Sequence, residues 1–268
     1  MERSIYLSCG SSANTALPGK SLDLVVTDPP FFDNVHYSEL ADFFFAWQQL
    51  EPSPFAQHRA TTRHAEEVQD VSPDQFAAKL RAVFLECCRV LKDDGLLVFT
   101  YHHSRTDGWT ALANAVIGAG ISFVNCHPVK AEMSVAAPKS QAKEPIQIDV
   151  VFVCRKKTLD VGVKKSVNDA FTLAIERAVA KARRLKSAGI ELSPGDKRVL
   201  LIGQFLTEIS AGREADKTSE IVANYSQKLQ AAAATVSAVR PVFKYNEAEA
   251  STDPQLILLE QASKLFAA

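Results

Sequence analysis

The sequence predicts an α/β fold, with an incomplete parallel sheet over residues 1–160 and a helical region over residues 161–268. In the first part, short apolar runs rich in β-branched residues alternate with amphipathic stretches, which is the pattern of repeated strand–helix units. In the second part, apolar residues recur at helical spacing and lack the alternation of strands. A length of 268 residues with 47% hydrophobic content suffices for one large globular domain with a helical appendage.

The stretch LDLVVTDPPFFDNVHY, residues 22–37, organises the first part. Its apolar run at residues 22–26 predicts a buried strand of a parallel sheet. The strand has to end at residues 28–31 (DPPF), because proline has no N–H to donate to a strand ladder. An acid, two rigid residues and an aromatic ring therefore lie at the carboxyl end of a central strand. Open α/β sheets bind their ligands at that edge.

The other elements of the first part follow in order. We expect further strands at residues 5–9, 96–100, 121–128 and 146–154, and helices at residues 37–50, from Ser72-Pro73 to residues 93–95, and at residues 107–118. In the helix at residues 37–50, apolar side chains recur at helical spacing and are expected in the core: Leu40, Phe43, Phe44 and Trp47. Beyond residue 161 we expect helices ending near residues 189 and 212, a third stopped by Pro241, and a fourth at residues 256–266.

The segment TDPPFFDNVHYSELADFFFAW resembles motif IV, D-P-P-[YF], of the S-adenosylmethionine-dependent amino-methyltransferases. It is most similar to the adenine-specific DNA methylases whose longer members carry a zinc ribbon and run close to DPPYYDNVxYSELSDFFYVW. Farther on, VLKDDGLLVFTYHHS resembles their VLKPxGLLVFTYHH segment. The resemblance covers residues 5–157 well and the remainder loosely. It implies a partial Rossmann-like methyltransferase sheet, with the target-base half of the catalytic domain at residues 1–160.

The resemblance also implies roles for individual residues. The Asp28 carboxylate and the Pro29 carbonyl would accept the two N–H bonds of an exocyclic amine, and Phe31 would stack on a base extruded from the duplex. The catalytic candidates are Asp28, Pro29, Pro30 and Phe31; the substrate-binding candidates are Phe32, Asn34, Tyr37, His102 and His103. The alternative for the motif is a plain strand-to-loop turn, and a histidine pair is more often structural. No metal site is expected, because the five cysteines form no C-x-x-C pair.

Each of two polar stretches can be interpreted in two ways. Residues 51–71 carry His58, Arg59, Arg63 and His64, and residues 132–145 carry Lys139 and Lys143 after Lys130. Each stretch is either a solvated loop or a contact to nucleic-acid phosphates. The net charge of −1 does not favour a DNA partner and does not exclude one, since a local basic patch is enough. No apolar run approaches the length of a membrane span and no signal peptide is apparent, so we expect a cytoplasmic protein without a membrane partner.

The expected cofactor, S-adenosylmethionine, has no recognisable site in the sequence. The resemblance requires a loop like F-x-G-x-G after the first strand and an acid on the second strand, and neither is found. The chain therefore reads as the carboxyl-terminal half of such an enzyme, with an exposed sheet edge that a cofactor-binding half or partner chain would complete. The alternatives are a non-catalytic subunit that binds DNA or a partner, and a methyltransferase acting on RNA or on a glutamine amide.

Overall fold

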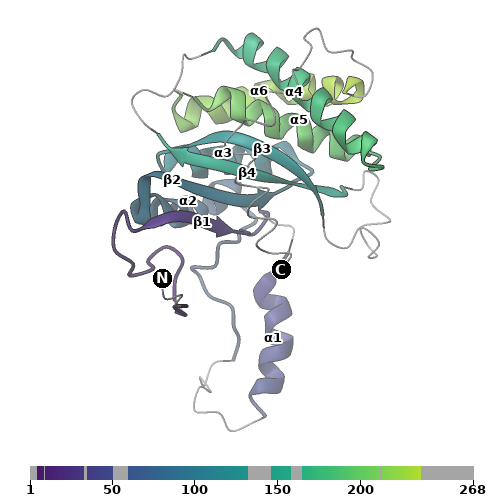
Figure 1. The fold of residues 1–268 in the computed structure, drawn as a ribbon. Coiled ribbons are helices and arrows are strands. Elements are labelled where there is room, and N and C mark those ends of the chain that lie inside the picture. The colour runs from purple at the N-terminus through teal and green to yellow at the C-terminus, as the bar shows by residue number, and fades with distance from the viewer. Residues whose placement is uncertain are drawn as a thin grey trace. The chain divides into compact units, whose positions relative to one another are not determined.

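The computed structural model describes residues 5–8, 10–32, 35–50, 60–131, 146–157, 165–211 and 213–236. These residues form an α/β fold with a four-stranded mixed sheet and a carboxyl-terminal helical region (Figure 1). The strands are β1 (Leu22–Thr27), β2 (Leu91–Tyr101), β3 (Ile121–Lys130) and β4 (Ile148–Lys156), in the order β1-β2-β4-β3. β1 and β2 are parallel, whereas β4 runs antiparallel to both β2 and β3. The sheet is therefore mixed and not purely parallel.

One expected strand is missing, and another lies elsewhere in the sheet than predicted. Residues 5–8 have no regular structure, and Ile5 and Leu7 are exposed. The prediction of a strand at residues 5–9 is therefore wrong for the residues that the structure describes. β1 was expected to be buried but is an edge strand among the described residues, with Leu24 50% and Val26 69% exposed. Local composition cannot distinguish a central strand from an edge strand, because that difference depends on whether a neighbour exists.

The core lies on one face of the sheet. α2 (Pro73–Val90) and α3 (Thr106–Gly118) pack on the aromatic side chains of this face: Phe84 lies 5.1 Å from Phe99, and Trp109 lies 6.4 Å from Phe152, between ring centroids. Tilted and T-shaped aromatic pairs of this kind bury large apolar areas. Leu24 and Val26 pair in register with Leu96 and Val98 and project from the opposite face. That face is open along β1.

The start of α2 was predicted correctly and its end was not. Ser72 caps the helix by accepting a hydrogen bond from the Gln75 N–H, and Pro73 occupies the first helical turn. The helix ends at Val90 and not at residues 93–95, because the chain enters β2 directly at Leu91. The Leu91 carbonyl accepts a hydrogen bond from the Lys156 ammonium at 2.6 Å, which holds this junction against β4.

The helical region comprises α4 (Val167–Ser187), α5 (Pro194–Ile209) and α6 (Ala215–Thr235). α5 packs against β3 and β4, and α6 packs against α3 (Figure 1). At the closest approach, a Cβ added to Gly203 would lie 2.5 Å from the Cys126 sulfur, so only glycine fits there without a shift. The described part of the helical region thus packs on the sheet, as expected. The fourth helix, at residues 256–266, lies outside the described residues.

α1 (Tyr37–Gln48) has no buried residue. Its apolar side chains are solvent-exposed, Phe43 at 62% and Trp47 at 63%, so their assignment to the core is wrong. Helical spacing identifies an apolar face, but it does not show that another element covers that face. Among the described residues, no helix is both long and apolar enough to cross a membrane.

Candidate functional site

The sheet topology brings the ends of four strands to one edge. β1, β2 and β3 end there, and the antiparallel β4 begins there. Tyr101 pairs with Val150, so His102 and Asp149 are the next residues outward on β2 and β4. The parallel pairing of β1 with β2 likewise brings Asp28 beside Thr100. A row of polar side chains thus crosses the edge where open α/β sheets bind ligands.

Asp28 is exposed and held in place by one hydrogen bond. The Thr100 hydroxyl donates to its Oδ1 atom. Tyr37 lies close enough to interact electrostatically with Asp28. Burial raises the pKa of the Tyr37 phenol, and the negative charge of Asp28 raises it further. An ionised carboxylate has about four lone-pair sites, so the bond from Thr100 leaves capacity for donors from a ligand.

The Phe31 ring is supported by two other rings. One belongs to Tyr101, the last residue of β2, and the other to His102, the next residue in the chain. The Phe31 centroid lies 5.4 Å from that of Tyr101 and 4.8 Å from that of His102, both at steep interplanar angles of 64° and 69°. Phe31 is only partly buried, whereas Pro29 is buried. The ring is thus held by edge-to-face contacts and keeps an accessible surface on which a planar ligand can stack.

Phe32 lies in the core behind the edge. Its backbone adopts φ of 56°, a left-handed conformation that is rare for a bulky residue, and its side chain is 1% exposed. The ring packs 5.3 Å from Phe76 and 5.5 Å from His103, with the Arg105 guanidinium 5.4 Å away. Strained backbone of this kind is found at functional sites, where surrounding packing maintains it. Phe32 therefore anchors the turn from below.

The two adjacent histidines have different environments. His103 is 1% exposed, accepts a hydrogen bond from the Arg105 N–H at 3.1 Å, and packs so closely on Gly108 that a side chain there would collide with its ring. His102 instead contacts Phe31 and bonds through Nδ1 to Oδ1 of Asp149. The structure thus places His102 with Phe31 and Asp149, and His103 with Phe32 in the core.

Asp149 was missed by sequence reasoning. Its only signal was an acidic residue inside the otherwise apolar run IDVVFV. Its backbone neighbours are fixed by the helical region, since Asp196 of α5 accepts hydrogen bonds from the N–H groups of Gln147 and Ile148. Asn34, a further predicted site residue, lies outside the described residues.

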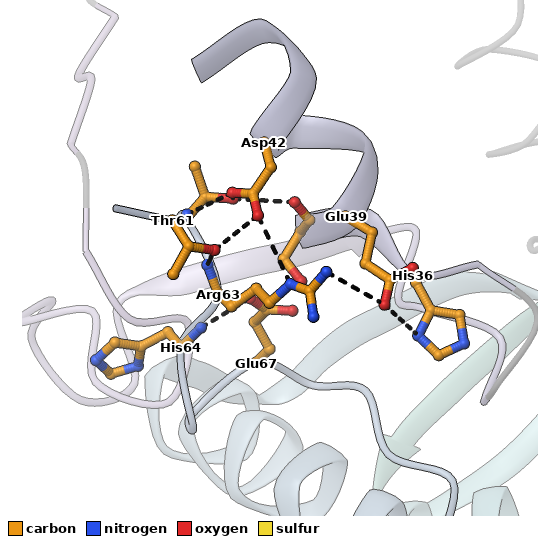
Figure 2. Close-up of polar contacts among 9 residues, drawn as sticks. His36, Glu39, Asp42, Thr61, Arg63, His64 and Glu67 are labelled. Carbon is orange, nitrogen blue, oxygen red and sulfur yellow. Dashed lines mark hydrogen bonds and ion pairs between the residues drawn. The ribbon is translucent and has the colours of Figure 1, made fainter. Parts of the chain in front are cut away.

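An open pocket at the start of α1 is lined by residues of α1 and of the stretch at residues 51–71, for which a solvated loop and a phosphate contact were both expected. Figure 2 shows polar contacts between these two segments. Arg63 lies 3.6 Å from carboxylate oxygens of both Glu39 and Asp42. Hydrogen bonds from Thr61 and Thr62 lower the Asp42 pKa to about 2. The loop is therefore tied to α1, and the charge of Arg63 is balanced locally, which favours a surface loop over a phosphate contact. His58 and Arg59 lie outside the described residues.

The described residues do not fit S-adenosylmethionine. The connection from β1 to α1 carries the DPPF segment, and that from β2 to α3 carries the two histidines; neither contains a glycine-rich turn at a helix start. No protein-family model matches the chain, and no curated protein matches it in sequence. The function has to be argued from the site itself.

Proposed function

We propose that this chain is the target-base half of an S-adenosylmethionine-dependent N6-adenine DNA methyltransferase, and that a second segment or chain supplies the cofactor. The carrying observation is the arrangement of Asp28 and Phe31 at the ligand-binding edge of the sheet. Thr100 holds the carboxylate of Asp28, and Tyr101 and His102 hold the ring of Phe31. An acceptor and a stacking ring are thus both held in place by consecutive residues of one segment, Thr100 to His102, before a ligand binds.

This arrangement suits an amino group on an aromatic ring. The lone pair of such an amine is delocalised into the ring, which makes it a poor nucleophile. Acceptors on its N–H bonds draw the nitrogen towards a tetrahedral form, and the Asp28 carboxylate with the Pro29 carbonyl would serve as these acceptors. Phe31 would stack on the base after it has left the duplex. Aspartate at position 28, where asparagine is the variant, favours a nucleobase amine over a glutamine amide.

The unpaired edge of β1 and its exposed apolar side chains support the proposal that the enzyme is incomplete. β1 has an unpaired edge among the described residues, and its Leu24 and Val26 leave apolar surface uncovered. An exposed strand edge readily pairs with another strand, and exposed apolar patches mark interaction sites. A cofactor-binding half that extends the sheet from β1 would cover both features at once.

The test compares binding of oligonucleotides to the purified chain by fluorescence anisotropy. One probe is a thymine tract with a single central adenine, and the other carries an abasic position there. The wild-type chain is expected to prefer adenine, whereas Asp28→Ala and Phe31→Ala should lose this preference and keep the affinity for the abasic probe. Asp23→Ala is the matched control, because Asp23 lies on the same strand in an exposed ion pair with Lys92. Equal wild-type binding of both probes contradicts the proposal.

The second candidate is a non-catalytic subunit that binds DNA or a partner methylase. The absence of a site for S-adenosylmethionine from the described residues favours it. The two candidates differ in the need for Asp28: a subunit that only binds should retain its effect on a partner methylase when Asp28 is replaced.

A further inference from the structure

His102 and Asp149 form a bonded pair beside the DPPF segment. The two side chains are 11% and 19% exposed, and the contact joins Nδ1 of His102 to Oδ1 of Asp149. Asp149 is the second residue of β4, whose start is held by the buried carboxylate of Asp196, with the Gln147 N–H at 2.7 Å and the Ile148 N–H at 3.2 Å. The carboxylate is thus presented from a rigid strand and not from a loop.

The pairing determines which ring nitrogen carries the proton. An ionised carboxylate only accepts hydrogen bonds, so the Nδ1 atom of His102 must donate. In the neutral imidazole the other nitrogen, Nε2, then has a free lone pair and acts as an acceptor. No described residue bonds to Nε2 of His102. Metal-binding histidines are fixed in one tautomer in the same way, because the ring nitrogen that does not bind the metal donates to a carboxylate.

The location of the His102 ring determines which groups its Nε2 atom can accept a hydrogen bond from. His102 directly follows β2, two residues after Thr100, which donates a hydrogen bond to Asp28. The His102 ring also contacts Phe31 at 4.8 Å. The two nitrogens of an imidazole point in divergent directions, so anchoring Nδ1 on β4 directs Nε2 away from β4, towards the side of Asp28 and Phe31.

We infer that Asp149 is a positioning residue that presents Nε2 of His102 as a further acceptor, which shares one of the two N–H bonds of the amino group on a ring stacked on Phe31 with the acceptors Asp28 and Pro29. This inference rests on the proposed function and deepens it by adding a second group, beside Asp28, that selects a ring with an amino group over a ring with a carbonyl. A ring with an amino group offers an N–H to Nε2. A ring with a carbonyl at the same position offers only an acceptor, and two lone pairs then face each other.

The test uses thymine-tract oligonucleotides with one central adenine or one central hypoxanthine, which carry an amino group and a carbonyl at the same ring position; hypoxanthine also carries a hydrogen on the neighbouring ring nitrogen N1. Binding is measured at pH 8. The wild-type chain is expected to prefer adenine by roughly threefold to tenfold, the effect of one net hydrogen bond. Asp149→Asn can accept from or donate to Nδ1, so it frees the other tautomer. It should lower this ratio without abolishing it, because the Asp28 carboxylate still favours the amino group, and Asp149→Glu should restore part of the loss.

Two further measurements separate positioning from damage to the fold. Nitrogen-15 NMR of the His102 ring should show a protonated Nδ1 and an unprotonated Nε2 in the wild type, and a mixture in Asp149→Asn. Asp94→Asn, an exposed residue of β2, is the control and should keep the wild-type ratio. An unchanged adenine-to-hypoxanthine ratio in Asp149→Asn overturns the inference alone. Equal wild-type binding of the adenine and abasic probes overturns the proposed function, and this inference with it.

Discussion

The carboxylate of Asp196 accepts a hydrogen bond from the backbone N–H of Gln147 at 2.7 Å, directly before β4 begins. Asp196 is fully buried and also completes the capping box of α5 with Ser193. One side chain therefore starts a helix and fixes the entry of the strand that carries Asp149. The helical region is in this way part of the structure that shapes the site.

We expect Asp196→Ala to lower the free energy of unfolding by about 3 kcal/mol, the sum of a lost helix cap and buried N–H groups left without an acceptor. Urea denaturation measures this change. Asp169→Ala is the matched control, since Asp169 occupies the corresponding position in α4 but its contact with Ser166 is exposed. The control should lose about 1 kcal/mol or less. Equal losses would mean that the contact with Gln147 contributes nothing.

The chain alone is expected to transfer little or no methyl group to DNA, and a supplied cofactor half should restore transfer. Without an aligned donor the reaction loses the proximity effect, roughly 7–11 kcal/mol of barrier. In the restored enzyme Asp28→Ala should abolish turnover and spare most DNA affinity, because phosphate contacts dominate binding. The measurement is tritiated methyl incorporation into DNA that contains adenine. Robust turnover by the chain alone would reveal a cofactor site outside the described residues.

Replacing the aromatic residues of α1 should barely affect stability. Phe43→Ser and Trp47→Ser are each expected to change the free energy of unfolding by about 0.5 kcal/mol or less, because both side chains are exposed. Phe84→Ala, in the buried aromatic cluster, should instead cost about 3–5 kcal/mol. Chemical denaturation of the three variants compares them directly. A large loss in the α1 variants would show that another part of the chain covers this helix.

Glu86 should make stability depend on pH in the acidic range. Hydrogen bonds from Arg89 and Thr15 lower its pKa from 4.5 to about 2. A lowered folded-state pKa contributes stability above the unfolded value of 4.5, and this contribution is lost as the pH falls towards 2. Glu86→Gln should therefore flatten the pH dependence of the melting temperature between these values. An identical slope in the variant would show that other carboxyl groups cause it.

Gly203→Ala should destabilise the protein, although alanine normally strengthens a helix. The added Cβ would lie 2.5 Å from the Cys126 sulfur, and such overpacking costs about 1–3 kcal/mol. Combining it with Cys126→Ala should recover part of the loss, since the smaller side chain makes room. Thermal denaturation of the single and double variants provides the test. Additive effects of the two substitutions would contradict close packing at this point.

The sequence by itself determined most of the secondary structure and the placement of the DPPF segment. The apolar runs at β1, β2 and β4 fix their positions locally, and the prolines after Asp28 end β1 whatever surrounds it. The cap at Ser72 is equally local, because its side chain bonds within the same helical turn. These features depend only on residues close together in the chain.

Only the tertiary structure decided which side chains meet. Phe31 and Phe32 are adjacent and chemically identical, yet one lies at the sheet edge and the other in the core, because a left-handed backbone turn separates them. The sequence was sufficient to predict the apolar face of α1. It did not show that this face is left exposed by the residues that the structure describes. Asp149 reaches His102 only because β4 runs antiparallel beside β2, which pairs residues 47 positions apart. Such pairing depends on strand order and direction, which local periodicity does not contain.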